Sequence, residues 1–207
     1  MKPFSSKHRA FTLIELLAVI GIIGVLVALL IPAIKSSLIK AEVSQAQSGI
    51  SNLSTAFKAY YTEYGKWPIS DTAATWNYVV DANMVALLSG SDIEAPYSTA
   101  QPTIESFGVV GGTHGTFQGN PRKIIFLQFK QSDLGNVPNC TGCYLDPWKK
   151  AYYVKFDVTY AGVTPSPFEN TNYWIASGSL IWSDGPDGQE NTVGGGVGIN
   201  KDNVTSW

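Results

Sequence analysis

The stretch FTLIELLAVIGIIGVLVALLIPAI, residues 11–34, decides the fold of this chain. No side chain from Leu16 to Ile34 is charged or strongly polar. At 1.5 Å per residue a helix over that run is about 29 Å long, close to the roughly 30 Å hydrocarbon core of a bilayer. The sequence therefore predicts a membrane-spanning helix over residues 11–34.

The ten residues before this stretch, MKPFSSKHRA, predict its orientation. They carry Lys2, Lys7 and Arg9 and no acidic residue. Positively charged flanks stay on the cytoplasmic side of a membrane helix. We therefore expect the leader in the cytoplasm and everything after Ile34 outside it.

Glu15 is an acidic residue near the start of the apolar run. An ionised carboxylate costs up to a few kcal/mol in lipid, so it needs a cationic partner. No Lys or Arg follows within the run. A cut between Ala10 and Phe11 would create an α-ammonium group on Phe11, about one helical turn from Glu15. The missing charge could thus come from the same chain or from a neighbouring copy.

The basic leader followed by FTLIELLAVIGIIGVL resembles the class III signal of type IV pilins and of the pseudopilins of type II secretion. The resemblance implies that a prepilin peptidase cuts after Ala10 and methylates the Phe11 amine. It also implies that Glu15 neutralises the terminus of a neighbouring subunit during filament assembly. Ala10 departs from the glycine that usually precedes the cut in this family.

Two simpler interpretations compete with a pilin-type signal. A secretory signal peptide would end in a small-residue cleavage site, but this run ends in Pro32-Ala33-Ile34-Lys35 without an A-x-A pattern. A plain single-span anchor remains possible on length alone. Neither alternative gives a reason for Glu15, so the pilin-type signal is favoured.

Composition excludes several functional classes. The formal net charge of −2 gives no electrostatic case for binding nucleic acid. The sequence has no G-x-S-x-G, no phosphate-binding loop and no metalloprotease helix, so we expect no enzyme. We divide the chain into a cleaved leader, a transmembrane helix, a stalk helix and an extracytoplasmic domain, at residues 1–10, 11–34, 35–64 and 65–207.

The first helix should continue beyond the membrane. Apolar residues recur at three- and four-residue steps through 35–64, which predicts an amphipathic helix ending near Gly65. Pro32 removes a backbone hydrogen bond and Gly24 weakens the same region, so we expect a kink or a locally melted turn between them. In the pilin family this region does melt in filaments. The alternative is that Gly and Pro are merely tolerated in a membrane helix.

The rest of the chain predicts a small antiparallel sheet, and the resemblance implies an α+β, pilin-like fold with the long helix packed on that sheet. Spacing predicts a short helix over 75–88, and β-branched and aromatic content predicts strands. The expected strands are 123–130, 152–158, 172–177 and 180–183. Residues 89–119 read as loop with one strand at 104–110, and the lone His114 within it indicates no site.

Cys140 and Cys143 form a C-x2-C pair in the outward part of the chain. Zinc would need two further ligands, and the two histidines lie in the leader and in a distant loop. In an oxidising compartment a small disulfide loop is the preferred interpretation, and free thiols are the second.

The tail SDGPDGQENTVGGGVGINKDNVTSW, residues 183–207, brings carboxylate and amide oxygens into a Gly-rich loop. Calcium takes six to eight such oxygens in a flexible cage, although the spacing is not that of an EF-hand. An ordinary Gly/Asp turn cluster is the alternative. The tail resembles the calcium loop of major pseudopilins, and the Asp-Pro-Trp at 146–148 resembles another of their elements. The candidate calcium ligands are Asp184, Asp187, Asp202 and Asn203, and Asp187 matches best. The family's acidic pair falls on Lys201 and Asn203, with Asp202 between them.

The resemblance is strongest to the major pseudopilin of type II secretion. It implies a filament subunit that is processed in the inner membrane and has its C-terminal domain in the periplasm. Its implied partners are other copies of itself, minor pseudopilins, the prepilin peptidase, membrane lipid and an inner-membrane platform with a cytoplasmic ATPase. The alternatives are a type IV pilin for adhesion, motility or DNA uptake, and a membrane-anchored binding module with a calcium-dependent surface.

Overall fold

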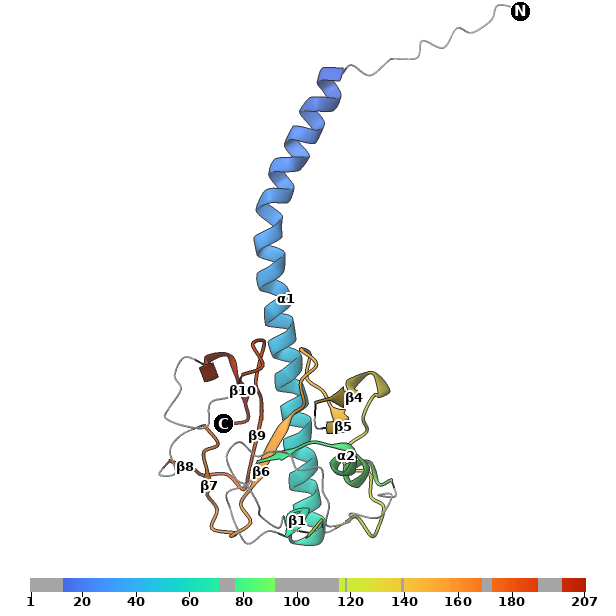
Figure 1. Ribbon diagram of the computed structural model, residues 1–207, viewed down its shortest axis with the longest axis vertical. Helices are drawn as coiled ribbons and strands as arrows, with labels where there is room; N and C mark the ends of the chain where they lie inside the picture. Colours follow the sequence, from blue (N-terminus) through green and yellow to red (C-terminus); the bar gives the residue numbers. More distant parts are fainter. Residues whose placement is uncertain are drawn as a thin grey trace, which may run out of the picture. The chain divides into compact units, whose positions relative to one another are not determined.

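The computed structural model describes residues 13–70, 77–91, 116–117, 119–138, 140–168, 173–189 and 199–207. The chain divides into two compact units, Met1–Ala41 and Glu42–Trp207. Helix α1, Leu13–Tyr64, contributes to both units (Figure 1). The predicted cleavage and methylation residues, Ala10 and Phe11, lie outside the described residues.

The first unit contains the apolar half of α1. Its most apolar 18-residue window has a mean hydropathy of 3.0 and no buried residue. By length and composition α1 can cross a membrane. Every residue from Gly24 to Pro32 is helical, so the single chain has no melted turn there. Melting between Gly24 and Pro32 in a filament stays a prediction.

The end of α1 is confirmed at the predicted place. Gly65 has a φ of +67°, in the left-handed region that glycine occupies without strain. Its N–H donates to the carbonyl of Tyr61 at 2.8 Å, which satisfies one of the last free carbonyls of the helix.

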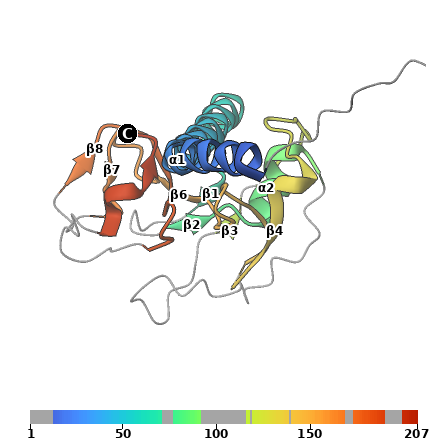
Figure 2. The same cartoon turned by 90° about the horizontal axis from the view of Figure 1, so that it is seen from above.

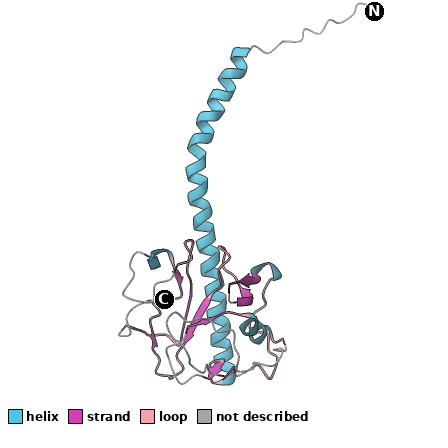
Figure 3. Ribbon diagram, viewed as in Figure 1, coloured by secondary structure: helices cyan, strands magenta, loops and turns pink. Residues whose placement is uncertain are grey.

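The second unit holds the strands and α2, Ala82–Ser89 (Figure 3). A four-stranded antiparallel sheet has the order β10-β9-β6-β2. Its strands are β2 (Tyr78–Val79), β6 (Tyr153–Phe156), β9 (Ser179–Ser183) and β10 (Val204–Thr205). Three strand pairs add β1 (Ile69–Ser70) with β3 (Thr116–Phe117), β4 (Leu134–Val137) with β5 (Cys140–Tyr144), and β7 (Thr164–Pro165) with β8 (Trp174–Ile175). Two 3-10 turns, η1 (Gln131–Asp133) and η2 (Ile199–Asp202), precede β4 and β10. The α+β class is confirmed.

The core lies between α1 and the four-stranded sheet. One face of α1 is fully buried and packs against sheet residues such as Val154, Phe156 and Ile181. The helix residues of this face are Ala46, Ile50, Leu53, Phe57 and Tyr60. The α2 helix and the β4–β5 pair lie on one side of this part of α1, and β7–β8 and β10 lie on the other (Figures 1 and 2).

The predicted helix over 75–88 is wrong in its first half. Tyr78 and Val79 form β2, and α2 begins only at Ala82. Asp81 is the N-cap, because its side chain accepts hydrogen bonds from the N–H groups of Asn83 and Met84. The helical spacing of apolar residues continues across Asp81, so it does not show that a strand ends and a helix begins there. The capping aspartate is the local signal that separates β2 from α2.

The predicted strand over 123–130 is also wrong, since none of these residues lies in a strand. The N–H groups of Phe126 and Leu127 both donate to the carbonyl of Leu88, which is incompatible with a regular ladder. Strands 152–158, 172–177 and 180–183 are confirmed in shorter or shifted form as β6, β8 and β9. The expected strand at 104–110 and His114 lie outside the described residues.

Candidate functional site

Glu15 lies in the first turn of α1. The positive end of the helix dipole favours a carboxylate at that position. The side chains around it are apolar and exposed, from Leu13 at 80% to Leu16 at 58%. The result is a carboxylate near the N-terminal end of an apolar helix.

The apolar half of α1 leaves its side chains uncovered. Within the described part of the first unit, the large hydrophobic residues are exposed by 46% (Val19) to 80% (Leu13). A surface of this kind needs lipid or other apolar helices around it, because a continuous apolar patch is unstable in water. This half of the helix therefore depends on partners outside the chain.

The Asp-Pro-Trp element and the tail, far apart in sequence, meet in the structure. Asp146 accepts hydrogen bonds from the Ser183 hydroxyl and, at 2.8 Å, from the Lys150 N–H. Trp148 donates its indole N–H to Glu42 of α1 at 3.0 Å. One element thus connects the end of β9 with the helix.

The C-terminal residues close the sheet. In β10, Val204 pairs with Ser183 and Thr205 with Trp182. The ring of Trp207 lies 5.5 Å from Phe168 and 6.4 Å from Trp182, measured between centroids. Residues 204–207 therefore pack against the rest of the second unit.

The four predicted calcium ligands lie in the two loops that flank this contact. Gly185 has a φ of +70°, and a Cβ on it would lie 2.2 Å from the carbonyl oxygen of Asp202. The Asp187 N–H donates to the Asp202 carboxylate at 3.3 Å. Asp184 Oδ1 and Asn203 Oδ1 are buried and have no hydrogen-bond partner among the described residues. The structure brings all four residues to neighbouring loops.

The electrostatics of this region disfavour an uncompensated charge. Burial raises the pKa of Asp184 to about 6, and the negative charges of Asp146 and Asp187 add to the effect. Burial also raises the pKa of Asp146. The described residues contain no group of three or more His, Cys, Asp or Glu arranged to hold a metal ion. Residues 190–198 of the predicted loop lie outside them, so the calcium site stays a prediction.

Cys140 and Cys143 are joined by a disulfide in β5. Cys143 is fully buried and Cys140 nearly so, in a small apolar cluster with Val79 and Ala151. The pair is therefore part of the packing beneath the β4–β5 hairpin.

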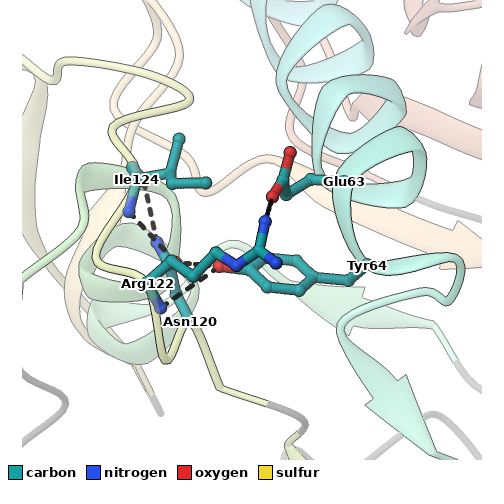
Figure 4. Close-up of polar contacts among 5 residues, drawn as sticks. All are labelled: Glu63, Tyr64, Asn120, Arg122 and Ile124. Carbon is teal, nitrogen blue, oxygen red and sulfur yellow. Dashed lines mark hydrogen bonds and ion pairs between the residues drawn. The ribbon is translucent and has the colours of Figure 1, made fainter.

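One polar cluster was missed at the sequence level (Figure 4). The side chain of Asn120 donates to the carbonyls of Leu87 and Ile124 at 2.9 and 2.7 Å. Its oxygen accepts from the Ile124 N–H and from the hydroxyl of Tyr64, at 3.1 and 2.6 Å. Arg122 forms an ion pair with Glu63 at the end of α1. The only local signal was the Asn120-Pro121 dipeptide, which marks a turn but not its partners.

A family model and several known proteins match parts of this chain. A family model described as "Prokaryotic N-terminal methylation motif" matches residues 5–31. A type IV major pilin of Neisseria gonorrhoeae is 41% identical over 70 residues, which are 34% of this chain and 42% of the pilin. A fimbrial protein of Eikenella corrodens is 31% identical over 110 residues, 52% of this chain and 70% of that protein.

A third relative, a type IV major pilin of Myxococcus xanthus, is 36% identical over 64 residues, 31% of this chain and 29% of the pilin. The chain thus spans about two fifths of the length of the gonococcal pilin that it matches. No solved structure matches. The residues that the family model matches lie in the leader and in the apolar half of α1.

Proposed function

The chain belongs to the type IV pilin-like family, and from that premise we propose that it is the major structural subunit of a type II secretion pseudopilus. The observation that carries this choice is the contact between Asp146 and Ser183. It joins the Asp-Pro-Trp element to the start of the tail, and these are the two parts that resemble major pseudopilins. Their packing against each other supports treating them as one structural feature.

In this proposal the peptidase cuts between Ala10 and Phe11 and methylates the new terminus. Glu15 then pairs with the ammonium group of an adjoining copy in the inner membrane, while the second unit lies in the periplasm. An assembly platform with a cytoplasmic ATPase extracts the subunits, and minor pseudopilins form part of the same filament. The exposed apolar half of α1 supports this path, since it can exchange lipid for the helices of other copies.

Calcium binding is part of the same proposal. Asp184, Asp187, Asp202 and Asn203 would supply oxygens to the ion, and the two unpartnered buried oxygens on Asp184 and Asn203 support it. The full chain in micelles is first stripped of metal with EDTA, which is then removed. Calcium should raise its unfolding temperature, and Asp187→Ala should abolish that rise. The matched control Asp133→Ala, an acid outside these loops, should keep it. An unfolding temperature unaffected by calcium would remove the ion from the proposal.

A type IV pilin is the second candidate, and the relatives, which are type IV pilins and a fimbrial protein, favour it. The two differ in where the filament acts and in what its loss impairs. Deleting the gene should block export of a secreted protein if the subunit is a pseudopilin. Loss of surface fibres, adhesion or motility with normal export would assign it to a pilus instead.

The test of assembly is common to both candidates. Mass spectrometry of the purified chain should find a terminus at Phe11 carrying one added methyl group. Glu15→Ala should abolish filaments in electron micrographs, whereas Glu63→Ala, which removes an acid in the second unit, should leave them intact. A chain that begins at Met1 and forms no filaments would contradict the proposal and point to a monomeric anchored module. Filaments unaffected by Glu15→Ala would contradict the role given to Glu15.

A further inference from the structure

A polar cavity of about 190 Å³ lies in the second unit, between α1 and the segment that leads into β4. Amide, hydroxyl and charged side chains form its walls, and two stacked tyrosines form its base. Those used in the argument below are Gln45 and Asn52 of α1, Gln128, Lys130 and Asp133 opposite, and Tyr144 and Tyr152 at the base. The cavity is separate from the tail loops and from the apolar half of α1.

The base of the cavity is formed in advance. The rings of Tyr144 and Tyr152 are stacked, with centroids 4.9 Å apart. A Cβ on Gly49 would lie 2.5 Å from the Tyr152 hydroxyl and 3.3 Å from the Tyr144 hydroxyl. The two phenols can therefore approach the helix only because residue 49 has no side chain. Burial raises the pKa of both hydroxyls, so both stay protonated at neutral pH. The Tyr152 hydroxyl donates to the Ala46 carbonyl at 3.4 Å, which leaves the Tyr144 hydroxyl as the donor at the base.

The walls carry unused hydrogen-bonding groups. The side chains of Gln45, Asn52 and Gln128 are exposed at the mouth of the cavity and make no hydrogen bond to any other described residue. Each amide offers both a donor and an acceptor. The single cation, Lys130, is balanced by the single anion, Asp133, so the lining has no net charge. A ligand that fits this lining is neutral and both donates and accepts at several points.

We propose that this cavity binds one neutral monosaccharide ring. Its volume of about 190 Å³ lies below the roughly 300 Å³ at which pockets for drug-sized ligands begin. Sugar hydroxyls both donate and accept, so they can reproduce the hydrogen bonds of the water that they displace. A singly charged ligand would leave either Lys130 or Asp133 facing a like charge.

Saturation-transfer NMR on the full chain tests the proposal. The protein is held in dodecylphosphocholine micelles, whose headgroup contains no sugar, and is titrated separately with glucose, galactose and N-acetylglucosamine. At least one sugar should receive saturation at its ring protons. Asn52→Ala should weaken that sugar's binding about fivefold, as expected for one lost hydrogen bond. Gln47→Ala, an exposed amide of the same helix outside this cavity, should leave it unchanged.

Several outcomes would overturn the proposal. They are no saturation transfer to any of the three sugars, equal loss in Asn52→Ala and Gln47→Ala, or transfer to glycine betaine, a zwitterion, in place of sugars. Circular dichroism melting shows whether each variant folds, and Gln128→Ala on the opposite wall replaces Asn52→Ala if that variant does not. The measurement uses dispersed single chains, so its result is independent of whether the protein forms a filament.

Discussion

The two halves of α1 have similar backbones and opposite surroundings. Between Leu13 and Ala41 the large apolar side chains are exposed, whereas between Glu42 and Tyr64 one face is buried against the sheet. The second half finds its partners within the chain and the first half does not. The difference teaches that folding of the domain and burial of the apolar helix are separate events, the second of which requires lipid or other copies.

The largest expected effect comes from a mutation that creates a cavity beside the buried half of α1. Phe57 is fully buried and meets Phe156 edge-to-face at 5.0 Å. Phe57→Ala should lower the free energy of unfolding by about 3–5 kcal/mol. The matched change Leu26→Ala in the exposed half should alter it by less than about 0.5 kcal/mol. Urea unfolding of the two variants in micelles measures both, and equal losses would break the distinction between the halves.

A pH titration sharpens the comparison, because the groups with raised pKa values lie in the second unit. The pKa of Asp184 rises from 3.8 to about 6 on folding. Between these values the folded state holds a proton that the unfolded state releases, so stability is present below pH 3.8 and is lost as pH rises towards 6. The loss is at most about 3 kcal/mol.

Asp184→Asn should remove this pH dependence and stabilise the EDTA-treated protein at neutral pH. The measurement is the unfolding midpoint in urea across that pH window, compared with Asp133→Asn. A wild-type midpoint that stays level through the window, or that falls just as far in Asp184→Asn, would contradict a raised pKa of Asp184 in the folded state.

One glycine in each half of α1 gives a matched pair of substitutions, whose expected effect on stability is smaller. Gly49→Ala forces a Cβ to within 2.5 Å of the Tyr152 hydroxyl and should cost about 1–3 kcal/mol. Gly24 has no atom within 4 Å of an added Cβ, so Gly24→Ala should be neutral or add up to about 1 kcal/mol of helix stability. Thermal unfolding followed at the tyrosine bands should separate them, and similar shifts would mean that the Tyr152 contact carries little energy.

The smallest expected effect concerns the indole contact at the start of the second unit. Trp148→Phe keeps a ring but removes the N–H that donates to Glu42. It should cost about 1 kcal/mol, which is typical of one hydrogen bond. Glu42→Gln, which keeps an acceptor, should cost less in the same unfolding assay. The reverse order would show that the interaction depends on charge more than on the hydrogen bond.

Local signals predicted the parts of the fold that depend on local chemistry. The end of α1 at Gly65 was predictable, because helices commonly end at a glycine in the left-handed conformation. The strand content of 152–158 and 180–183 was predictable from residue type. Residues 123–130 have the same strand-like composition, yet their N–H groups bond to Leu88. Which segments meet is a long-range property, and composition alone does not contain it.

The candidate site divides in the same way. Glu15 was identifiable because a carboxylate in an apolar run violates a strong physical preference. The meeting of Asp146 with Ser183 was visible only as two separate motifs, since nothing local relates positions that are far apart in sequence. The Asn120 cluster had no usable signal, because its partners come from α1, α2 and its own turn.

The close approach of Gly90 to the backbone of Lys123 has a practical consequence. A Cβ on Gly90 would lie 2.6 Å from the Lys123 carbonyl oxygen, and Asn120 donates to the Leu87 carbonyl, so the end of α2 and the turn at 120–123 are held together. Each doubling of the length between such ends costs only about 0.6 kcal/mol of closure entropy. A foreign peptide inserted between Ser91 and Thr116 would therefore be attached to packed structure at both ends, to α2 at one end and to β3 at the other.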